Sequence, residues 1–254
     1  MNKYIAGLVA LTFAAPVSAA TVDLSGWVEN GRVNNNAGTW TVQGTNNDSV
    51  YQSINGNPTI FYDPSGNAQG KQLSGKITVD GTDDDYIGFV LGYQNDEINS
   101  TNGDFWLIDW KQGDQGNAVD GLVLSHVTGD ISASDSGASG AGDWWAHNGV
   151  VSEKQRATNL GSTGWNRNQE YTFDLVFTAN LIQVFVDGVL EIDYAGSFTD
   201  GAFGFYNYSQ ANVRYAGITE DVAPPSAVPL PATLPLLGAG FAAFGLMRRK
   251  RKSS

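Results

Sequence analysis

The stretch YTFDLVFTANLIQVFVDGVLEI, residues 171–192, decides the fold class. Apolar and polar side chains alternate from Tyr171 to Phe177 and again from Leu181 to Val186, which is the period of a β-strand with one buried face. Asp187-Gly188 follows and tolerates the positive φ angles of a type I′ turn. The stretch therefore predicts strands joined by tight turns, one at Ala179-Asn180 and one at Asp187-Gly188.

Short apolar segments of this kind recur along the chain, separated by clusters of Gly, Asn, Asp and Ser that favour turns. Ile87–Tyr93 is almost continuously apolar, which predicts a central strand buried on both faces. We find no amphipathic helix of ten residues between the ends of the chain. Many short strands without helices predict an all-β fold, an antiparallel jelly-roll β-sandwich. The other predicted strands are 40–42, 50–52, 59–62, 71–79, 105–110, 122–124, 203–208 and 213–218.

The first twenty residues have the pattern of a secretory signal peptide. Lys3 supplies a positive charge, Ile5–Ala15 is apolar, and Val17-Ser18-Ala19-Ala20 supplies the small residues that a signal peptidase needs. We therefore expect residues 1–20 to direct export and the folded domain to span residues 21–220.

The C-terminal end carries a second address. Residues 221–232 form a linker that ends in Val228-Pro229-Leu230-Pro231-Ala232. An apolar segment, Thr233–Met247, and a basic tail, residues 248–254, follow. This order predicts a short transmembrane helix with the tail on the cytoplasmic side. It resembles the PEP-CTERM class of bacterial sorting signals, which implies cleavage near the motif by an exosortase-type enzyme and release or attachment at the cell surface. A plain membrane anchor is the alternative.

Charge and composition exclude several function classes. The ends hold six of the 14 basic residues and no acidic ones, so the body carries 8 basic against 26 acidic residues, a net charge of −18. Such a body argues against nucleic acid or an anionic membrane as partner. With no cysteine and only two histidines, nucleophilic Cys chemistry and Cys/His zinc clusters are excluded. Divalent cation binding remains compatible with the acidity.

Three adjacent carboxylates, Asp83-Asp84-Asp85, precede the predicted buried strand at 87–93. They repel one another unless a cation or solvent screens them, and hard oxygen ligands suit calcium. Asp83 and Asp85 point to the same side of an extended segment and can share one ion. If the following hairpin folds back, Asp96 or Asp104 could complete the shell. The alternative is a solvated acidic turn.

Several segments together resemble the thrombospondin C-terminal domain over about residues 80–218. The resemblance starts at Thr82–Gln94 and continues through Phe105–Gln112 and Gly121–Leu124. It resumes at Gly201–Tyr206 and Ser209–Asn212. It implies an L-type-lectin-like jelly roll that binds calcium and other extracellular molecules, without catalysis. The chain lacks that family's calcium-rich repeats, epidermal-growth-factor-like modules and cysteines, so partners of animal members cannot be carried over.

Thr128–Trp145 is rich in Gly, Ser, Ala and Asp and is expected to be a long exposed loop. Trp144, Trp145 and Trp165 are candidate exposed aromatics for ligand binding, although the first two could instead pin the loop to the sandwich. We expect a non-catalytic surface or matrix protein that mediates adhesion by binding extracellular polysaccharide or matrix protein. A glycoside hydrolase, which would need paired carboxylates, and an inert structural protein of the biofilm matrix are the alternatives.

Overall fold

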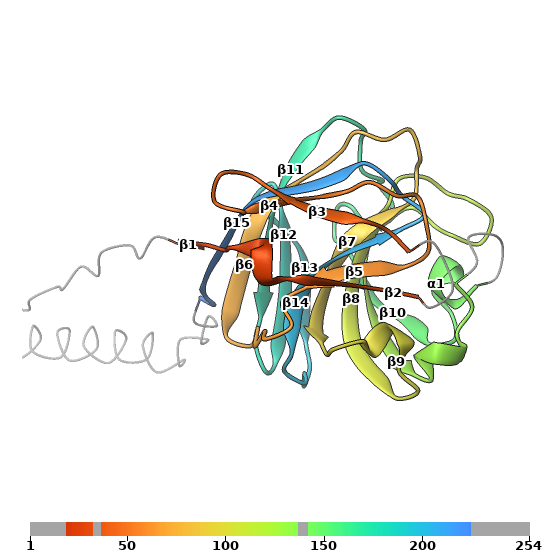
Figure 1. Cartoon of the computed structure of the whole chain (residues 1–254). Coiled ribbons are helices and arrows are strands. Elements are labelled where there is room, and N and C mark those ends of the chain that lie inside the picture. The colour runs from red at the N-terminus through yellow and green to blue at the C-terminus, as the bar shows by residue number, and fades with distance from the viewer. Residues whose placement is uncertain (1–18, 33–36, 137–141, 225–254) are drawn as a thin grey trace, which may run out of the picture. The chain divides into compact units, whose positions relative to one another are not determined.

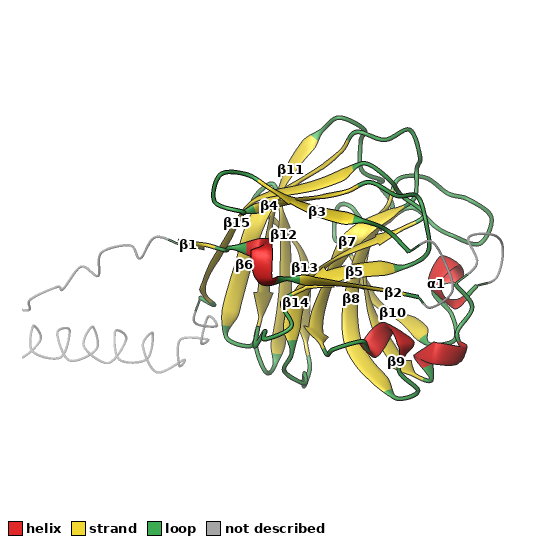
Figure 2. Ribbon diagram, in the orientation of Figure 1, coloured by secondary structure: helices red, strands yellow, loops and turns green. Residues whose placement is uncertain are grey.

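The computed structural model describes residues 19–32, 37–136 and 142–224, and these residues form two antiparallel β-sheets that face each other (Figures 1 and 2). The predicted sandwich is confirmed. Its strands are β1 (Ala20–Thr21), β2 (Val28–Gly31), β3 (Trp40–Gln43), β4 (Ser49–Gln52), β5 (Thr59–Tyr62), β6 (Lys71–Val79), β7 (Tyr86–Tyr93), β8 (Gly103–Lys111), β9 (Gly121–Gly129), β10 (Val151–Arg156), β11 (Glu170–Phe177), β12 (Leu181–Val186), β13 (Val189–Ala195), β14 (Ala202–Tyr208) and β15 (Val213–Val222).

Each of the two sheets draws its strands from different parts of the chain. The first has the order β13-β12-β11-β6-β15-β4-β3, with β1 paired to β15, and the second has the order β10-β9-β8-β7-β14-β5-β2. Short helical turns complete the described chain: η1 (Leu24–Gly26), η2 (Glu97–Asn99), η3 (Ile131–Ala133) and the four-residue helix α1 (Asp143–Ala146). The first two and the last two strands of the described chain each contribute one strand to either sheet, so both sheets contain strands from the two ends of the domain.

The hairpins predicted from residues 171–192 are present. β12 and β13 pair from Val186↔Val189 outward, and Asp187 and Gly188 between them have φ angles of 49° and 76°. Both angles are positive, as a type I′ turn requires. At the other turn the Thr178 amide donates to the Leu181 carbonyl at 2.9 Å.

Two hydrophobic cores hold the sandwich. The larger lies between the sheets and includes Phe89, Phe173 and Tyr215. The smaller lies on the opposite face of the second sheet, where α1 contributes Trp144 and Trp145. All eight residues of β7 are buried as a result, as predicted for a central strand covered on both faces.

Three strands escaped the sequence analysis: β1, which has only two residues, and β2 and β10, whose side chains are mostly solvated. β10 buries only Val151 fully, and β2 buries none of its residues completely. Both strands are edges of the second sheet, so neither shows the strong alternation that a half-buried strand has.

The register defines two ends of the sandwich. At the end that we call the tail end, Val222 of β15 pairs with Lys71 of β6 and Thr21 pairs with Thr219. At the opposite end, the loop end, Val213 pairs with Val79. The predicted transmembrane helix and the sorting motif lie outside the described residues. Within the described part of the chain, no helix is long and apolar enough to cross a membrane.

Candidate functional site

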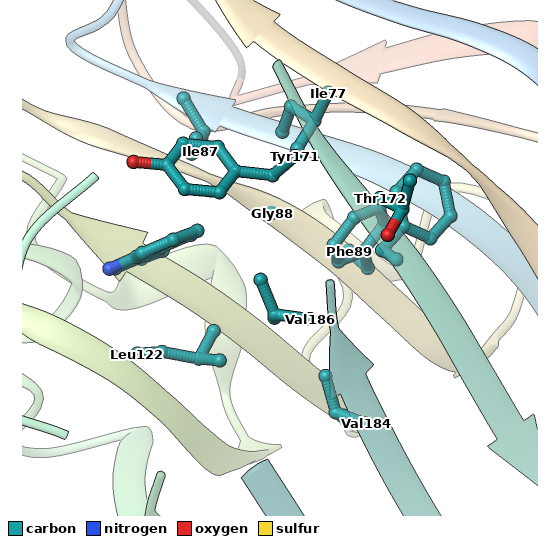
Figure 3. A pocket seen from close by; sticks show the side chains of 11 residues that line it. Ile77, Ile87, Gly88, Phe89, Leu122, Tyr171, Thr172, Val184 and Val186 are labelled. Carbon is teal, nitrogen blue, oxygen red and sulfur yellow. The ribbon is translucent and has the colours of Figure 1, made fainter. Parts of the chain in front are cut away.

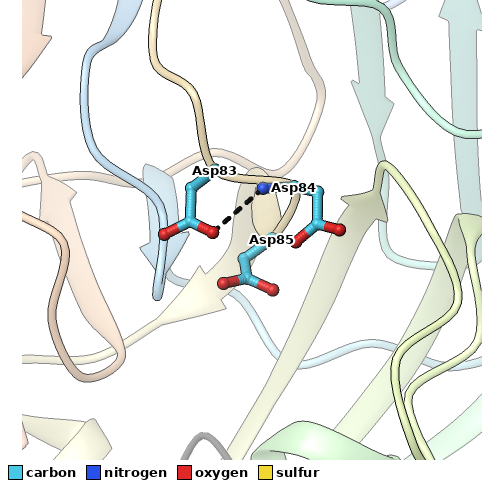
Figure 4. A group of neighbouring side chains, drawn as sticks. All are labelled: Asp83, Asp84 and Asp85. Carbon is cyan, nitrogen blue, oxygen red and sulfur yellow. Dashed lines mark hydrogen bonds between the residues drawn. The ribbon is translucent and has the colours of Figure 1, made fainter.

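The acidic triplet lies at the loop end, directly before β7. Carboxylate oxygens of Asp83, Asp84 and Asp85 lie within 4.8 Å of one another (Figure 4). The Asp84 amide donates to Asp83 Oδ1 at 3.2 Å, which is the dashed line in the figure. Asp83 and Asp84 are partly exposed, whereas Asp85 is buried because it opens the central strand segment.

A buried lysine supplies the cation for Asp85. Lys111, the last residue of β8, is fully buried, and its Nζ donates to Asp85 Oδ1 at 2.7 Å. The same ammonium donates to the Asp84 carbonyl at 3.1 Å and to Gln115 Oε1 at 3.3 Å. Burial raises the pKa of the Asp85 carboxyl, and the Lys111 ammonium opposes that rise. The Lys111 ammonium is therefore the partner that offsets the cost of burying this carboxylate.

Aromatic rings enclose this ammonium. Lys111 Nζ lies 5.4 Å from the centre of the Tyr86 ring and 4.7 Å from that of the Trp145 ring, both within cation–π range. Tyr86 also donates its hydroxyl to the Trp145 carbonyl at 2.7 Å. The lysine thus connects the acidic triplet to the helix α1 that covers the second sheet.

The backbone around Asp85 is fixed by side chains from distant parts of the chain. The Asp85 amide donates to Gln210 Oε1 at 3.0 Å, and Trp165 Nε1 donates to the Asp85 carbonyl at 3.0 Å. The Asn55 carboxamide donates to Asp83. The triplet is therefore a cluster of charge that hydrogen bonds with three distant side chains also hold in place.

Asp96 and Asp104 do not complete a cation site with the triplet, so that expectation is wrong. In the β7–β8 pair Tyr86 lies opposite Lys111 and Leu91 lies opposite Trp106. Asp96 follows the far end of β7, and Asp104 is at the start of β8, so both are at the tail end. At about 3.3 Å per residue over seven to eight residues, roughly 25 Å separates them from the triplet. The hairpin folds back as expected, but its register moves these two carboxylates away.

Asp96 and Asp104 have other partners at the tail end. Asp104 Oδ1 lies 2.6 Å from His126 Nε2, and Asn99 Nδ2 donates to Asp96 Oδ1 at 2.7 Å. Glu97 between them accepts the backbone amides of Gln94 and Asp104 at 2.8 and 2.6 Å. Burial raises the pKa of Glu97, and these amide donors oppose the rise.

The three tryptophans proposed as exposed ligand platforms are buried, so that expectation is also wrong. Trp144, Trp145 and Trp165 are 0%, 2% and 1% exposed. Trp144 Nε1 donates to Ser134 Oγ and Trp145 Nε1 to the Gln115 carbonyl, at 2.9 and 3.2 Å. Large rings gain most from complete burial when their N–H finds a partner. The pair in α1 pins its segment to the second sheet, the alternative named above.

An ionic network that the sequence did not reveal lies beneath α1; the side chains of His147 and Asp109 are buried, and that of Glu153 is partly exposed. His147 Nε2 is 2.9 Å from Asp109 Oδ2, and His147 Nδ1 is 3.2 Å from Glu153 Oε1. Burial disfavours the charged imidazole, but the Asp109 and Glu153 carboxylates outweigh it and raise the pKa of His147 to about 9. The hydrogen bond from His147 lowers the pKa of Glu153 to about 2. His147 is therefore a cation at neutral pH and joins α1 to β8 and β10.

Asp109 and Lys111 did carry a signal in the sequence. They stand two residues apart, hence on one face, in a strand that is otherwise apolar from Phe105 to Trp110. A charged residue inside such a strand is buried only when it is paired. The identity of the partners, Asp85 and His147, required the fold.

Two grooves open on the surface of the described domain. The first, about 430 Å³, lies on the outer face of the first sheet and is lined by Ser74, Lys76, Thr172, Asp174 and Thr219 together with backbone. The second, about 280 Å³, lies at the loop end between the 157–169 segment and the β12–β13 turn. Both grooves are open concave surfaces at which a ligand can be held.

Comparison with known families identifies two parts of the chain. The family described as the Thrombospondin C-terminal region matches residues 35–222. The PEP-CTERM protein-sorting motif matches residues 227–252, which indicates export and surface sorting. No curated protein matches the chain.

Solved structures share the fold at low sequence identity. A carbohydrate binding module, CBM66, from Bacillus subtilis has a TM-score of 0.51 at 14% identity, covering 77% of this chain and 95% of that one. The VIP36 exoplasmic/lumenal domain in a Ca²⁺/Man2-bound form has a TM-score of 0.52 at 14% identity, covering 80% and 84%. A Bacillus subtilis protein of unknown function with a galectin-like fold has a TM-score of 0.51 at 8% identity, covering 79% and 92%. These similarities establish the lectin-like sandwich.

Proposed function

The chain belongs to the family of the thrombospondin C-terminal region, and from this membership we propose that it is an exported carbohydrate-binding protein that acts by binding alone. The observation that carries the proposal is the lectin-like sandwich joined to a surface-sorting motif. The structures that share this sandwich include a carbohydrate binding module and a sugar-bound lumenal domain. The partner class is extracellular polysaccharide, and adhesion at the cell surface is the consequence.

The carboxylates that line the two grooves favour binding over hydrolysis. Glu191 is buried and accepts the amides of Asn159 and Leu160 at 2.8 and 3.1 Å. Asp187 accepts the Thr172 amide at 2.8 Å, and Asp174 accepts from Gln72 at 3.1 Å. These carboxylates are engaged by donors of the protein itself, whereas a glycosidase needs two carboxyl groups that flank the scissile bond. The glycoside hydrolase alternative therefore receives no support from the grooves.

Sugar binding can be tested by applying the exported protein to an array of neutral and acidic glycans. Saturable binding to at least one glycan class is expected. An array without hits, combined with loss of biofilm cohesion on deletion, would instead favour the inert matrix protein. Products released from a polysaccharide, and lost on substitution of one carboxylate, would require the enzyme alternative.

Calcium at the acidic triplet is the second part of the proposal, and the residues fit it only in part. Three carboxylates and the Lys111 ammonium leave a formal net charge of −2, which one calcium ion would neutralise. Asp83 and Asp84 are accessible, but Asp85 is engaged by the Lys111 ammonium. Because calcium takes six to eight oxygens, water must supply most of its shell here. We therefore expect a weak site, with Kd of about 10⁻⁴ to 10⁻³ M, the range of extracellular modules.

Thermal unfolding in calcium and in chelator tests this site. Calcium should raise the Tm of the wild type, because only the folded state binds the ion. Asp83→Asn/Asp84→Asn is expected to abolish this rise, because it removes the two accessible carboxylates. Asp193→Asn, on the exposed face of β13, is the matched control and should keep the full rise. An equal calcium effect in both variants, or no effect in the wild type, would reject calcium binding at the triplet.

The sorting motif is proposed to direct cleavage by an exosortase-type enzyme near Val228–Ala232, as the matched motif class implies. Before processing, the segment Thr233–Met247 would hold the chain in the membrane. Mass spectrometry of the surface protein should find no Arg248–Lys252 peptide. Recovery of that peptide from the mature protein would favour the plain anchor.

A further inference from the structure

The second groove has a composition suited to a sugar. Its floor is formed by Trp110 and Tyr171, whose rings are 4.8 Å apart, and its rim carries Thr163, Asn166, Gln169 and Asp187. Trp110 and Tyr171 are only 4% and 6% exposed, so they offer a small apolar floor rather than an open platform. Sugars combine a C–H surface with hydroxyls, and a small apolar floor inside a ring of amides and hydroxyls matches both.

The groove borders the interior of the sandwich. Trp110, Tyr171 and Val186 line both this groove and a narrow apolar void of about 10 Å³ between the sheets (Figure 3). In the figure the Tyr171 ring lies over the void with its hydroxyl directed away from it. A space of this size holds about one water-sized probe, so the ligand stays in the outer groove.

Hydrogen bonds within the protein hold the walls of the groove. Trp110 Nε1 donates to the Thr163 carbonyl at 2.8 Å, and the Asn166 amide donates to the Tyr171 hydroxyl at 2.8 Å. Asn166 Nδ2 donates to Gln169 Oε1 at 3.1 Å, which orients the two rim amides toward each other. A preformed rim reduces the ordering cost of binding.

The charge of the groove selects among sugars. Its charged lining residues are Asp187 and Glu191, and within the described chain no lysine or arginine lines it. The neighbouring arginines are held elsewhere: Arg156 donates to the Gly161 and Asp120 carbonyls at 2.7 Å each, and Arg167 donates to the Thr82 carbonyl. A uronate carboxylate would meet like charge without a counter-ion, which disfavours it.

We propose that this groove is a binding subsite for one uncharged sugar unit of an extracellular polysaccharide and that it discriminates against uronic acids. The inference rests on the proposed carbohydrate-binding function and adds the location and the ligand class. Its volume, near the lower limit of about 300 Å³ for ligand pockets, suits a single sugar unit rather than a long segment.

The test compares neutral gluco-oligosaccharides with oligogalacturonates of equal length, titrated into the exported protein by calorimetry. Asn166→Ala/Gln169→Ala removes two rim amides and keeps the backbone amide that holds Tyr171. This variant should bind the neutral sugar about tenfold more weakly, the loss of one to two hydrogen bonds. Gln183→Ala is the control. The Gln183 amide lies on the outer face of β12 and donates to Asp193 of β13, so this variant should bind like the wild type.

The indole N–H signal of Trp110 in a nitrogen–proton NMR spectrum gives a second readout that does not depend on the variant folding well. The neutral sugar should shift this signal before those of the other tryptophans. Wild-type binding with an unchanged Trp110 signal and an unaffected rim variant would overturn the subsite and leave the carbohydrate-binding function standing. Equal or tighter binding of the uronates would overturn the selectivity. No binding by the wild type to any sugar would overturn the proposed function itself.

Discussion

Lys111→Met is the substitution that tests most directly how the acidic triplet is held. Methionine keeps an unbranched apolar side chain in the fully buried position but removes the ammonium. Asp85, also buried, would then be an unpaired carboxylate, and breaking a buried pair from one side costs about 3–5 kcal/mol. The two cation–π contacts, about 0.5–1 kcal/mol each, are lost as well. We expect the free energy of unfolding to fall by about 4 kcal/mol.

The assay is urea unfolding followed by tryptophan fluorescence. Asp85→Asn/Lys111→Met removes both charges, so it should be less destabilised than the sum of the single variants, with a coupling energy of about 2–3 kcal/mol. In Lys111→Met the folded pKa of Asp85 lies above its unfolded value. That variant should therefore gain stability as the pH falls, and its deficit should be smaller at about pH 5 than at about pH 8.

A loss below about 1 kcal/mol, or a loss of the same size with and without the Asp85→Asn change, would refute this reasoning. The first result would mean that water reaches the pair and screens it. The second would mean that Lys111 contributes by packing alone, because its effect would not depend on the carboxylate.

His147→Gln removes the cation between Asp109 and Glu153. The folded pKa of His147 is about 9 against an ordinary 6.5, so its stabilisation of about 3 kcal/mol is present below pH 6.5 and is lost as the pH rises through about 9. Thermal unfolding across that window should show the loss in the wild type, and the same slope in the variant would contradict it. Gly88→Ala places a Cβ 2.0 Å from the Ile108 carbonyl and should cost about 3 kcal/mol in urea unfolding; a neutral result would mean that the strands separate freely.

The strands of this fold were predictable wherever one face is buried. The limits of β5, β6 and β12 were predicted to the residue, because their alternation or apolar runs end at Gly, Asp or Asn. Val151–Arg156 was missed because a polar edge strand has no period to detect. This segment is a strand because it pairs with β9, which is mostly buried and lies close to it in the sequence.

The candidate site was less predictable, since its chemistry depends on register. Asp83, Asp84 and Asp85 were found from sequence because they are adjacent. The lysine that neutralises one of them is brought to it by the β7–β8 pairing. The burial of Trp144 and Trp145 was hidden in a segment whose Gly-, Ser- and Asp-rich composition is typical of loops. Their burial comes from rings of β14: the Tyr206 ring lies 6.1 Å from that of Trp144, and the Tyr208 ring lies 5.6 Å from that of Trp145.

The pairing of Thr21 with Thr219 places the first and the last strand of the described chain side by side at the tail end. β1 and the end of β15 meet at the tail end, where the described chain leaves for its sorting segment, whereas the acidic triplet and the sugar groove are at the loop end. Nine residues of β6 connect the two ends, a stand-off of about 30 Å. Many copies attached to one surface would each present a groove. A long polymer could then engage many of them at once, and avidity would make even millimolar subsites sufficient for firm attachment.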